Sequence, residues 1–456
     1  MKHHSPTIAQ QTKTTVTDVV RWTQELDRLH TRIAPRFARP EPRRRALAFL
    51  HGILSTTSRK NGWQLAEHAR EARPDGMQRL LGRSVWDTDG VRDDLRTYTL
   101  EHLGNTSAIV VIDETSFPKK GKKSAGVGVQ YCGTSGQVEN CQVGVFLSYV
   151  TAKGHTPISR ELYLPLDWIE DRDRRQAAGI PDSVRFQTKP ELAVQMLERL
   201  WQTQIPICWV VADTVYGGNL DLRTWLEAHQ YSYVVAVPCN EPVGVLTSDG
   251  QRRRVEVCEV EALRLHAQDW QRLSMSEDRR GPRLFDWACV PMLHRWEDDG
   301  QHWVLIRRHL TDPNEKVYYF VFAPQGTTLP EMVAAIGARW HIEEDFENAK
   351  DSGLDHYEVR SFIGWYRHIT LVLLALAFLT GICATERCST SPPAPSAFPT
   401  RLTVLPLTIP EVRHLLARLI WPSCSSAYRV LAWSWWRRGH QSRASYYHTK
   451  RRLKAG

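Results

Sequence analysis

The sequence lacks the cysteine and histidine spacings of the common zinc sites. Its nine cysteines are odd in number and scattered, and no Cys-x-x-Cys pair occurs among them. This spacing argues against a cysteine-based zinc site or a redox motif. The His-Glu-x-x-His motif of zinc proteases is also missing, which disfavours that class of enzyme. We therefore expect reduced thiols in a cytoplasmic, nucleoid-associated protein.

Signals for membrane insertion or secretion are also missing. The N-terminal segment MKHHSPTIAQQTKTT is polar and has no apolar core of the kind found in signal peptides. The most apolar run, 369–384, is bounded by His368 and Arg387 and is shorter than the roughly 20 residues of a membrane span. It therefore predicts a buried core helix, and no membrane partner is expected.

Positive charge is in excess. The 456 residues include 59 Lys and Arg against 50 Asp and Glu, which gives a formal net charge of +9. Such a balance favours a polyanionic partner, nucleic acid first and an anionic membrane second, although a merely basic soluble enzyme would have the same charge. The length is sufficient for more than one domain.

The N-terminal quarter of the chain has a helical pattern. Residues 1–30 form a polar lead-in. From Arg32 to Lys60 there are eight basic residues against one acidic residue, Glu41. Asn61 and Asp87 stand where they can cap helices. We expect 31–105 to be an α-helical, DNA-binding domain, and the alternative is a helical lobe that only packs on the next domain.

The pattern changes near residue 107 to that of an α/β domain with a mixed sheet, over 106–238. Continuous apolar runs at 108–112 and 207–212 predict strands buried on both faces. Further segments complete the pattern: strands at 126–132, 138–150 and 231–237, and helices at 190–202 and 219–229.

The remainder divides by composition into four segments. Residues 239–328 predict a β-rich insertion, and 329–385 predict core helices, the first a long helix from Leu329 through Lys350. Residues 386–400 are a Pro/Ser-rich linker, followed by a basic C-terminal region, 401–456. From Trp433 onward there is no acidic residue, and aromatics alternate with bases, which suits phosphate contacts and base stacking, unless the tail is merely solvated. The bases expected to bind DNA there are Arg437, Arg438, Arg451 and Arg452.

Two aspartates follow the two buried strands directly. Asp113 comes after the run 108–112, and Asp213 comes after 207–212. Buried carboxylates are costly unless they are paired or bind a cation. If the two strands are neighbours, the carboxylates converge, and divalent cations would relieve their repulsion. Either aspartate alone could equally be a turn or cap residue.

A third carboxylate is predicted on the helix Arg339-Trp-His-Ile-Glu-Glu-Asp-Phe-Glu-Asn-Ala-Lys350. At about 100° per residue, Arg339, Glu343 and Lys350 share one helix face. This face offers a metal-binding carboxylate between two cations suited to phosphate oxygens. A salt-bridged surface helix would show the same pattern, and Glu347, one turn further on, is the rival to Glu343.

With these residues the chain resembles the DDE transposases of bacterial insertion sequences. The closest branch carries a Y-x2-R-x3-E-x6-K signature, the IS-four-like group, and Arg339, Glu343 and Lys350 match its last three positions. The segments Val-Val-Ile-Asp113-Glu-Thr-Ser-Phe and Val-Val-Ala-Asp213-Thr-Val-Tyr-Gly resemble the family's first and second aspartate strands. The signature tyrosine would fall at Ile336, a departure from the pattern.

The resemblance implies an RNase-H-like core with a β-rich insertion before the catalytic glutamate. It also implies two Mg²⁺ ions, with Mn²⁺ as a substitute, held by Asp113, Asp213 and Glu343 for in-line attack on a phosphodiester. Arg339 and Lys350 would bind phosphates. The expected partners are transposon-end and target DNA, with a homodimer in the DNA complex. The alternatives are an RNase-H-like endonuclease without strand transfer and an inactive DNA-binding relic.

Overall fold

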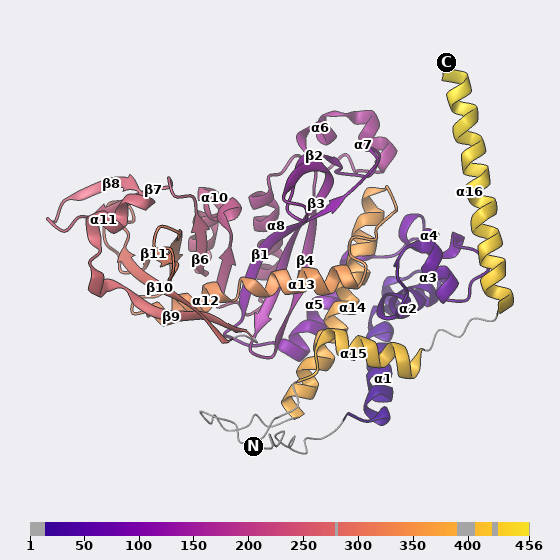
Figure 1. Cartoon of the computed structure of the whole chain (residues 1–456), viewed down its shortest axis with the longest axis horizontal. Coiled ribbons are helices and arrows are strands. Elements are labelled where there is room, and N and C mark those ends of the chain that lie inside the picture. The colour runs from indigo at the N-terminus through magenta and orange to yellow at the C-terminus, as the bar shows by residue number, and fades with distance from the viewer. Residues whose placement is uncertain (1–13, 279–280, 390–405, 422–426, 456) are drawn as a thin grey trace, which may run out of the picture.

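The computed structural model describes residues 14–278, 281–389, 406–421 and 427–455. A large sheet occupies the middle of the molecule, with the N-terminal helices packed at one end and the segment after β6 at the other (Figure 1). The last helix, α16 (Ala427–Ala455), extends away from the remainder of the protein. The cysteines whose side chains are described are free thiols, in agreement with the scattered spacing.

The strands in chain order are β1 (Ile109–Pro118), β2 (Gly128–Cys132), β3 (Gln137–Thr151), β4 (Gly154–Tyr163), β5 (Trp209–Ala212), β6 (Ser232–Val237), β7 (Pro242–Leu246), β8 (Arg252–Glu256), β9 (Gln271–Asp278), β10 (Gly281–Pro291), β11 (His302–Arg308) and β12 (Lys316–Phe322). The helices before β5 are α1 (Val16–Ile33), α2 (Pro40–Leu54), α3 (Gly62–His68), α4 (Asp75–Gly82), α5 (Thr88–Leu103), α6 (Leu166–Glu170), α7 (Arg172–Ala178) and α8 (Lys189–Gln202). Those after β5 are α9 (Thr214–Gly217), α10 (Leu220–Ala228), α11 (Val260–Arg264), α12 (Leu329–Gly337), α13 (Trp340–Asp351), α14 (Phe362–Ser389), α15 (Ile409–Leu415) and α16. Short 3₁₀ or π turns are η1 (Ala34–Arg36), η2 (Val257–Glu259), η3 (Ala267–Asp269) and η4 (Leu416–Ile420).

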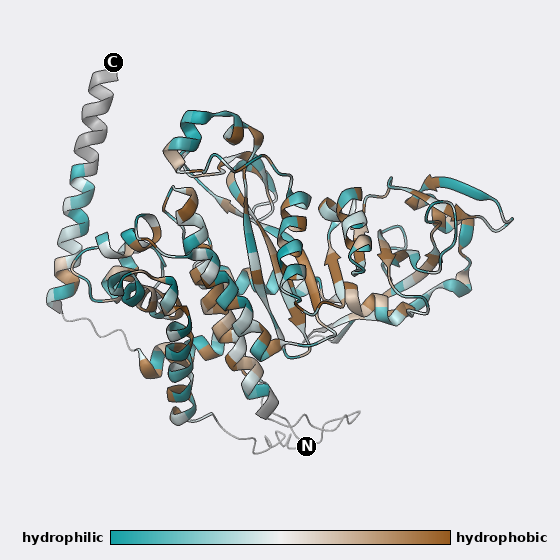
Figure 2. Ribbon diagram, turned by 180° about the vertical axis from the view of Figure 1, so that it is seen from behind, coloured by the Kyte–Doolittle hydropathy of each residue, from teal (hydrophilic) through white to brown (hydrophobic). Residues whose placement is uncertain are grey.

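Within the described residues the main sheet has ten strands. Its order is β2-β3-β1-β5-β6-β12-β11-β10-β9, with β4 paired to β3. The centre, β1-β5-β6, is parallel, whereas β1 with β3 and β6 with β12 are antiparallel. The fold is therefore mixed α/β, as the alternation of strands and helices predicted. Hydrophobic residues gather in the strands of this sheet (Figure 2).

The segment 239–328 is rich in strands, but most of them are not separate from the main sheet. Strand β12 pairs with β6 from Tyr318 to Phe322, and β11, β10 and β9 follow it outward. A separate two-stranded sheet is formed by β7 and β8. The predicted limit at residue 238 therefore marks a change of composition, and the hydrogen-bonded sheet continues across it.

Local signals set the N-terminal helices. The Asn61 side chain accepts hydrogen bonds from the amides of Trp63 and Gln64 at the start of α3. Asp87 accepts one from the amide of Gly90 at the start of α5. Both predicted caps are confirmed, and they satisfy amides that a helix start leaves unpaired. This helical region packs on α14 through α2, α4 and α5, while its DNA-binding role stays a prediction.

Helix α14 is the predicted apolar helix, and it lies in the core. It is the one helix among the described residues that is long and apolar enough to cross a membrane. However, 94% of its most apolar 18-residue stretch is buried inside the protein. It packs against α5 and β4. A helix that is hydrophobic on all sides needs such complete burial, so the prediction of a core helix is confirmed.

The predicted single helix from Leu329 to Lys350 is wrong. Two helices take its place, because α12 ends at Gly337 and α13 begins at Trp340. Gly337 lies against the backbone of β9, where an added Cβ would be 1.9 Å from the carbonyl oxygen of Met275. Only glycine permits this close approach, and the next two residues, Ala338 and Arg339, form a turn between the two helices.

Candidate active site

The two predicted aspartates occupy adjacent positions on neighbouring parallel strands. Ile112 of β1 is paired with Ala212 of β5, and Asp113 and Asp213 are the residues that directly follow this pair in the chain. One expectation needs correction: β1 does not end at Ile112. It runs on to Pro118, and Asp113 is paired with Phe146 of β3. Strand β5 does end at Ala212, so the parallel pairing stops beside Asp113.

Asp213 begins a helical turn. Its Oδ1 accepts a hydrogen bond of 2.9 Å from the amide of Val215, at the N-terminus of α9. The capping role considered from the sequence is therefore present in the structure. This single hydrogen bond leaves the Asp213 carboxylate able to bind another ligand, since a carboxylate can accept several hydrogen bonds or metal contacts.

The guanidinium of Arg339 joins α13 to β1. Its Nη2 lies 3.6 Å from Oδ2 of Asp113, and its Nη1 lies 3.3 Å from Oε1 of Glu343. Since one planar guanidinium contacts both carboxylates, Asp113 and Glu343 lie at the same place on the protein. The face predicted for Arg339 and Glu343 is thus turned toward the strand that carries Asp113.

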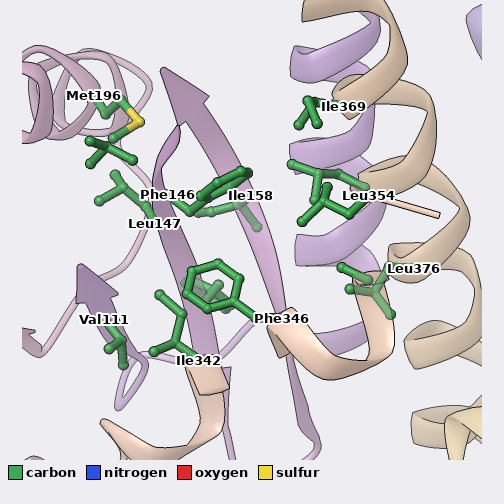
Figure 3. Close-up of a cluster of buried hydrophobic side chains, with 14 of the residues drawn as sticks. Val111, Phe146, Leu147, Ile158, Met196, Ile342, Phe346, Leu354, Ile369 and Leu376 are labelled. Atoms are coloured by element: carbon green, nitrogen blue, oxygen red, sulfur yellow. The ribbon is translucent and has the colours of Figure 1, made fainter. Parts of the chain in front are cut away.

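Packing below the charged face fixes α13 on the sheet. Ile342 and Phe346 are buried on the side of α13 that meets β1, β3 and β4. The ring of Phe346 makes an edge contact with that of Phe146, with centroids 5.4 Å apart. Figure 3 shows Phe346 and Ile342 between Phe146 and Val111. This apolar contact positions Glu343 one turn away from Phe346.

The carboxylates are crowded and poorly solvated. Burial, together with the charges of Asp213 and Glu114, raises the pKa of Asp113 to about 7 against the opposing charge of Arg339. Burial also raises the pKa of Asp213, with Glu114 adding to the shift. A single arginine therefore does not balance the negative charge collected here. A set of carboxylate oxygens with excess negative charge is the donor set that hard divalent cations prefer, so these residues fit a metal centre.

Sequence reasoning did not include Glu114, which lies next to Asp113 and is held in place by two hydrogen bonds. Lys189 Nζ donates to its Oε1 at 2.6 Å, and the hydroxyl of Tyr216 donates to its Oε2 at 2.6 Å. Lys189 belongs to α8, and Tyr216 belongs to α9, directly after Asp213. The available signal was the Asp-Glu pair at the end of an apolar run. Glu114 therefore joins β1, which carries Asp113, to α8 and to α9, the helix that Asp213 caps.

Other carboxylates on α13 point elsewhere. The buried Asp345 receives a 2.8 Å contact from Nδ1 of His155, and Glu344 lies 3.2 Å from Nε2 of the same ring and 3.1 Å from His341. Glu347 is exposed. Among these acidic residues, Glu343 is the one for which the described contacts include Arg339. The geometry therefore supports Glu343 over Glu347 as the third carboxylate.

Lys350 lies two turns beyond Glu343 on α13. Its Nζ donates a hydrogen bond of 3.1 Å to the hydroxyl of Thr134, in the turn between β2 and β3. Burial lowers the pKa of the Lys350 ammonium. The hydroxyl of Thr134 in turn donates to the carbonyl of Ser116 on β1, so Lys350 lies near the far end of the strand that carries Asp113.

The predicted DNA-binding arginines of the C-terminal region are in different surroundings. Arg437 forms a 2.5 Å ion pair with Glu67 of α3, whereas Arg438 is exposed. The side chains of Arg451 and Arg452 lie outside the part that the structure describes. Trp433 is buried nearby, and its indole donates to the carbonyl of Glu71. The first turns of α16 are therefore docked on the N-terminal helices.

Comparison with known families gives two overlapping matches. Residues 32–280, more than half of the chain, match the family described as DDE superfamily endonuclease. Residues 188–378 match the transposase DDE domain. The first range contains Asp113 and Asp213, and the second contains Asp213 and Glu343.

A similar protein and two solved structures were also found. The protein named "Probable transposase for insertion sequence element IS701", from Microchaete diplosiphon, is 25% identical over 354 residues, covering 75% of this chain and 83% of its own. A piggyBac transposase synaptic complex with hairpin DNA aligns over 91% of this chain and 84% of its own at 12% identity, with a TM-score of 0.35. The NurA nuclease from Sulfolobus solfataricus aligns over 60% of this chain and 83% of its own at 9% identity, with a TM-score of 0.22. Neither structure is similar enough to define this fold. The family matches are decisive, and the chain belongs to the DDE superfamily of endonucleases.

Proposed function

We propose that this protein is an insertion-sequence transposase that cleaves DNA at the ends of its element and joins those ends to target DNA. The observation that carries the proposal is the guanidinium of Arg339, which contacts both Asp113 and Glu343 beside the register neighbour Asp213. The transposase DDE domain match and the insertion-sequence relative support the same reading. We also propose that the protein is a member of the Y-R-E-K branch of these transposases and that its catalytic core is RNase-H-like.

Asp113, Asp213 and Glu343 would hold the divalent ions, and Mg²⁺, with Mn²⁺ as a substitute, is proposed because all three ligands are hard oxygens. When bound, such ions activate the attacking water or 3′-hydroxyl and stabilise the leaving oxygen. The protein's own task is to hold three carboxylates in one place against their repulsion. Parallel pairing of β1 with β5 does this for the aspartates, and Arg339 does it for Glu343.

Arg339 and Lys350 supply positive charge next to the carboxylates. A guanidinium has five N–H donors, so Arg339 retains donors for a phosphate oxygen while it contacts Asp113 and Glu343. The Lys350 ammonium, bound to Thr134, adds a second cation further along α13. We propose that these two side chains bind the DNA backbone on either side of the scissile phosphate. The proposed partners are transposon-end DNA and target DNA. The protein would bind them as a homodimer, and the complex would form in the nucleoid.

Strand transfer separates this proposal from its alternatives. The test uses purified protein, Mg²⁺, a supercoiled plasmid and labelled DNA ends taken from the genomic sequence that flanks the gene. A transposase is expected to cut these ends and to join a pre-cut end with a free 3′-hydroxyl to the plasmid. Cleavage without joining would identify an endonuclease alone. Binding with neither reaction would identify an inactive relic.

The C-terminal arginines provide a prediction about DNA affinity. Replacing Arg438, Arg451 and Arg452 together by Ala is expected to weaken binding and flatten its salt dependence, because each lost phosphate contact removes roughly 0.9 from the log–log slope. Arg437→Ala is the matched control, since Glu67 already neutralises this arginine, and it should leave the slope nearly unchanged. The slope is measured by fluorescence anisotropy across a salt series. An unaltered slope in the triple variant would show that these arginines of the C-terminal region do not contact DNA phosphates.

A further inference from the structure

A second cluster of metal-ligating side chains lies far along the sheet from the carboxylate centre. It consists of Glu227 from α10, His294 from the turn after β10, and His302 at the start of β11. One ligand atom from each of the three lies within 4.8 Å of the others. Glu227 is remote in sequence from the two histidines: it belongs to the core helix α10, and they belong to the β-rich segment.

His302 is the buried centre of this cluster. Only 3% of the residue is exposed, and its Nδ1 lies 2.7 Å from Oδ2 of Asp299. Its Nε2 is buried and makes an ion-pair contact of 3.4 Å with Oε1 of Glu227, with no closer hydrogen-bond partner among the described residues. This contact is longer than an ordinary hydrogen bond, so it leaves the nitrogen able to bind a ligand. The Nε2 atom of His302 is therefore directed at another member of the cluster, Glu227.

The two well-placed ligands each have a supporting contact. Asp299 holds the Nδ1 side of His302, which leaves Nε2 for a ligand. The hydroxyl of Tyr233 donates a 2.7 Å hydrogen bond to Oε1 of Glu227. Carboxylate–histidine and hydroxyl–carboxylate contacts of this kind orient the ligands in metal sites. The arrangement therefore has outer contacts as well as candidate ligand atoms.

His294 completes the cluster from a turn. Its ring stacks on that of His302, with centroids 4.4 Å apart and an angle of 9°. The turn that follows has positive φ at Arg295 and Trp296 and is closed by a bridge from His294 to Glu297. Stacked rings direct their nitrogens along parallel planes, so a shared ion requires the His294 ring to tilt. His294 is only partly buried, so the proposal includes a rotation of this ring toward the other two ligands.

We propose that Glu227, His294 and His302 form a binding site for a divalent cation of the zinc type. Two imidazoles and one carboxylate are ligands that Zn²⁺ accepts, whereas Mg²⁺ and Ca²⁺ prefer sites made only of oxygen. Tetrahedral bonds of about 2.1 Å place two ligand atoms roughly 3.4 Å apart. The Nε2 of His302 and Oε1 of Glu227 have this separation, 3.4 Å, already. The site is independent of the catalytic carboxylates and of the proposed transposase activity.

The bound ion would join the core to the β-rich segment. Glu227 belongs to the helix that precedes β6, and His302 begins β11, which is separated from β6 in the sheet by β12. An ion that binds only the folded arrangement stabilises it by mass action. Its effect would therefore be seen as a higher melting temperature, with the DNA-cleaving centre unchanged.

The experiment uses the full-length chain, stripped of metal and kept in millimolar Mg²⁺ so that the carboxylate centre is saturated. Co²⁺ is titrated and followed by visible absorption, Zn²⁺ is then added in competition, and bound zinc is counted after dialysis. Wild-type protein should hold one zinc equivalent that is lost in His294→Ala and His302→Ala. Asp299→Asn should weaken binding about 10–100-fold, as loss of an outer contact does in other metal sites.

Two matched variants keep the result specific. His266→Ala removes a histidine with a 71% exposed side chain from the same part of the chain, and it should retain the zinc. His155→Ala alters the other cluster of potential ligands, His155, His341 and Glu344, and it should retain the zinc as well. His294→Ala removes a partly exposed side chain, so the test does not depend on replacing the buried His302. Absence of zinc from the wild type, or its loss with His155→Ala alone, would overturn the proposal.

Discussion

Asp113→Asn, Asp213→Asn and Glu343→Gln are each expected to lower metal-dependent DNA cleavage on the order of 10³-fold or more, with DNA binding retained. The amide keeps the shape of the side chain but removes the charge that holds a hard divalent cation. Loss of that cation removes several kcal/mol of transition-state stabilisation. Cleavage of labelled end DNA and a gel-shift assay measure the two properties on the same protein.

Glu347→Gln is the control for this series. Glu347 lies on the same helix but is exposed, and the described contacts of Arg339 go to Asp113 and Glu343. The variant should keep most of the wild-type activity. An active Glu343→Gln protein together with an inactive Glu347→Gln protein would identify Glu347, one helical turn further on, as the third metal ligand. Activity that survives in either aspartate variant would reject the DDE mechanism.

Phe346→Ala is expected to reduce the free energy of unfolding by about 3–5 kcal/mol, the usual cost of removing a buried phenylalanine ring. Phe346 is 8% exposed and packs on Phe146 of β3. Because this contact seats α13 on the sheet, cleavage should fall with stability even though Phe346 touches no reacting group. Denaturant unfolding followed by tryptophan fluorescence measures the first effect, and the cleavage assay measures the second.

A conservative variant separates packing from chemistry. Phe346→Leu retains most of the apolar volume, so both stability and cleavage should lie between those of the wild type and Phe346→Ala. Glu347→Ala, at the exposed neighbouring position, should leave the unfolding midpoint close to the wild-type value. A Phe346→Ala protein with unchanged stability and activity would show that α13 is positioned by other contacts.

Local sequence signals predicted much of the fold. Continuous apolar runs located β1 and β5, because strands covered on both faces need apolar residues at every position. The caps Asn61 and Asp87 followed from side-chain acceptors placed ahead of helical patterns. The helical face shared by Arg339 and Glu343 followed from spacing alone. Each of these features depends on residues that are close together in the chain.

The features that were not predicted depend on distant residues. Strand β4 was absent from the predictions because its pattern includes the buried charges Arg160 and Glu161, whose partners Asp89 and Arg199 lie far away in sequence. The break between α12 and α13 follows Gly337, whose close contact is with the backbone of β9, far away in the sequence. The role of Glu114 as a link between α8 and α9 depends on hydrogen bonds that no local pattern reveals.

The continuity of the main sheet determines how the molecule responds to load. Strands β9 to β12 are hydrogen-bonded in sequence to β6, and β6 is bonded to β5, the strand that ends next to Asp213. A pull or twist applied to β9 would therefore pass through the backbone hydrogen bonds of β10, β11, β12 and β6 before it reaches β5. We therefore expect bending at this end of the protein to be felt at the end of β5, next to Asp213.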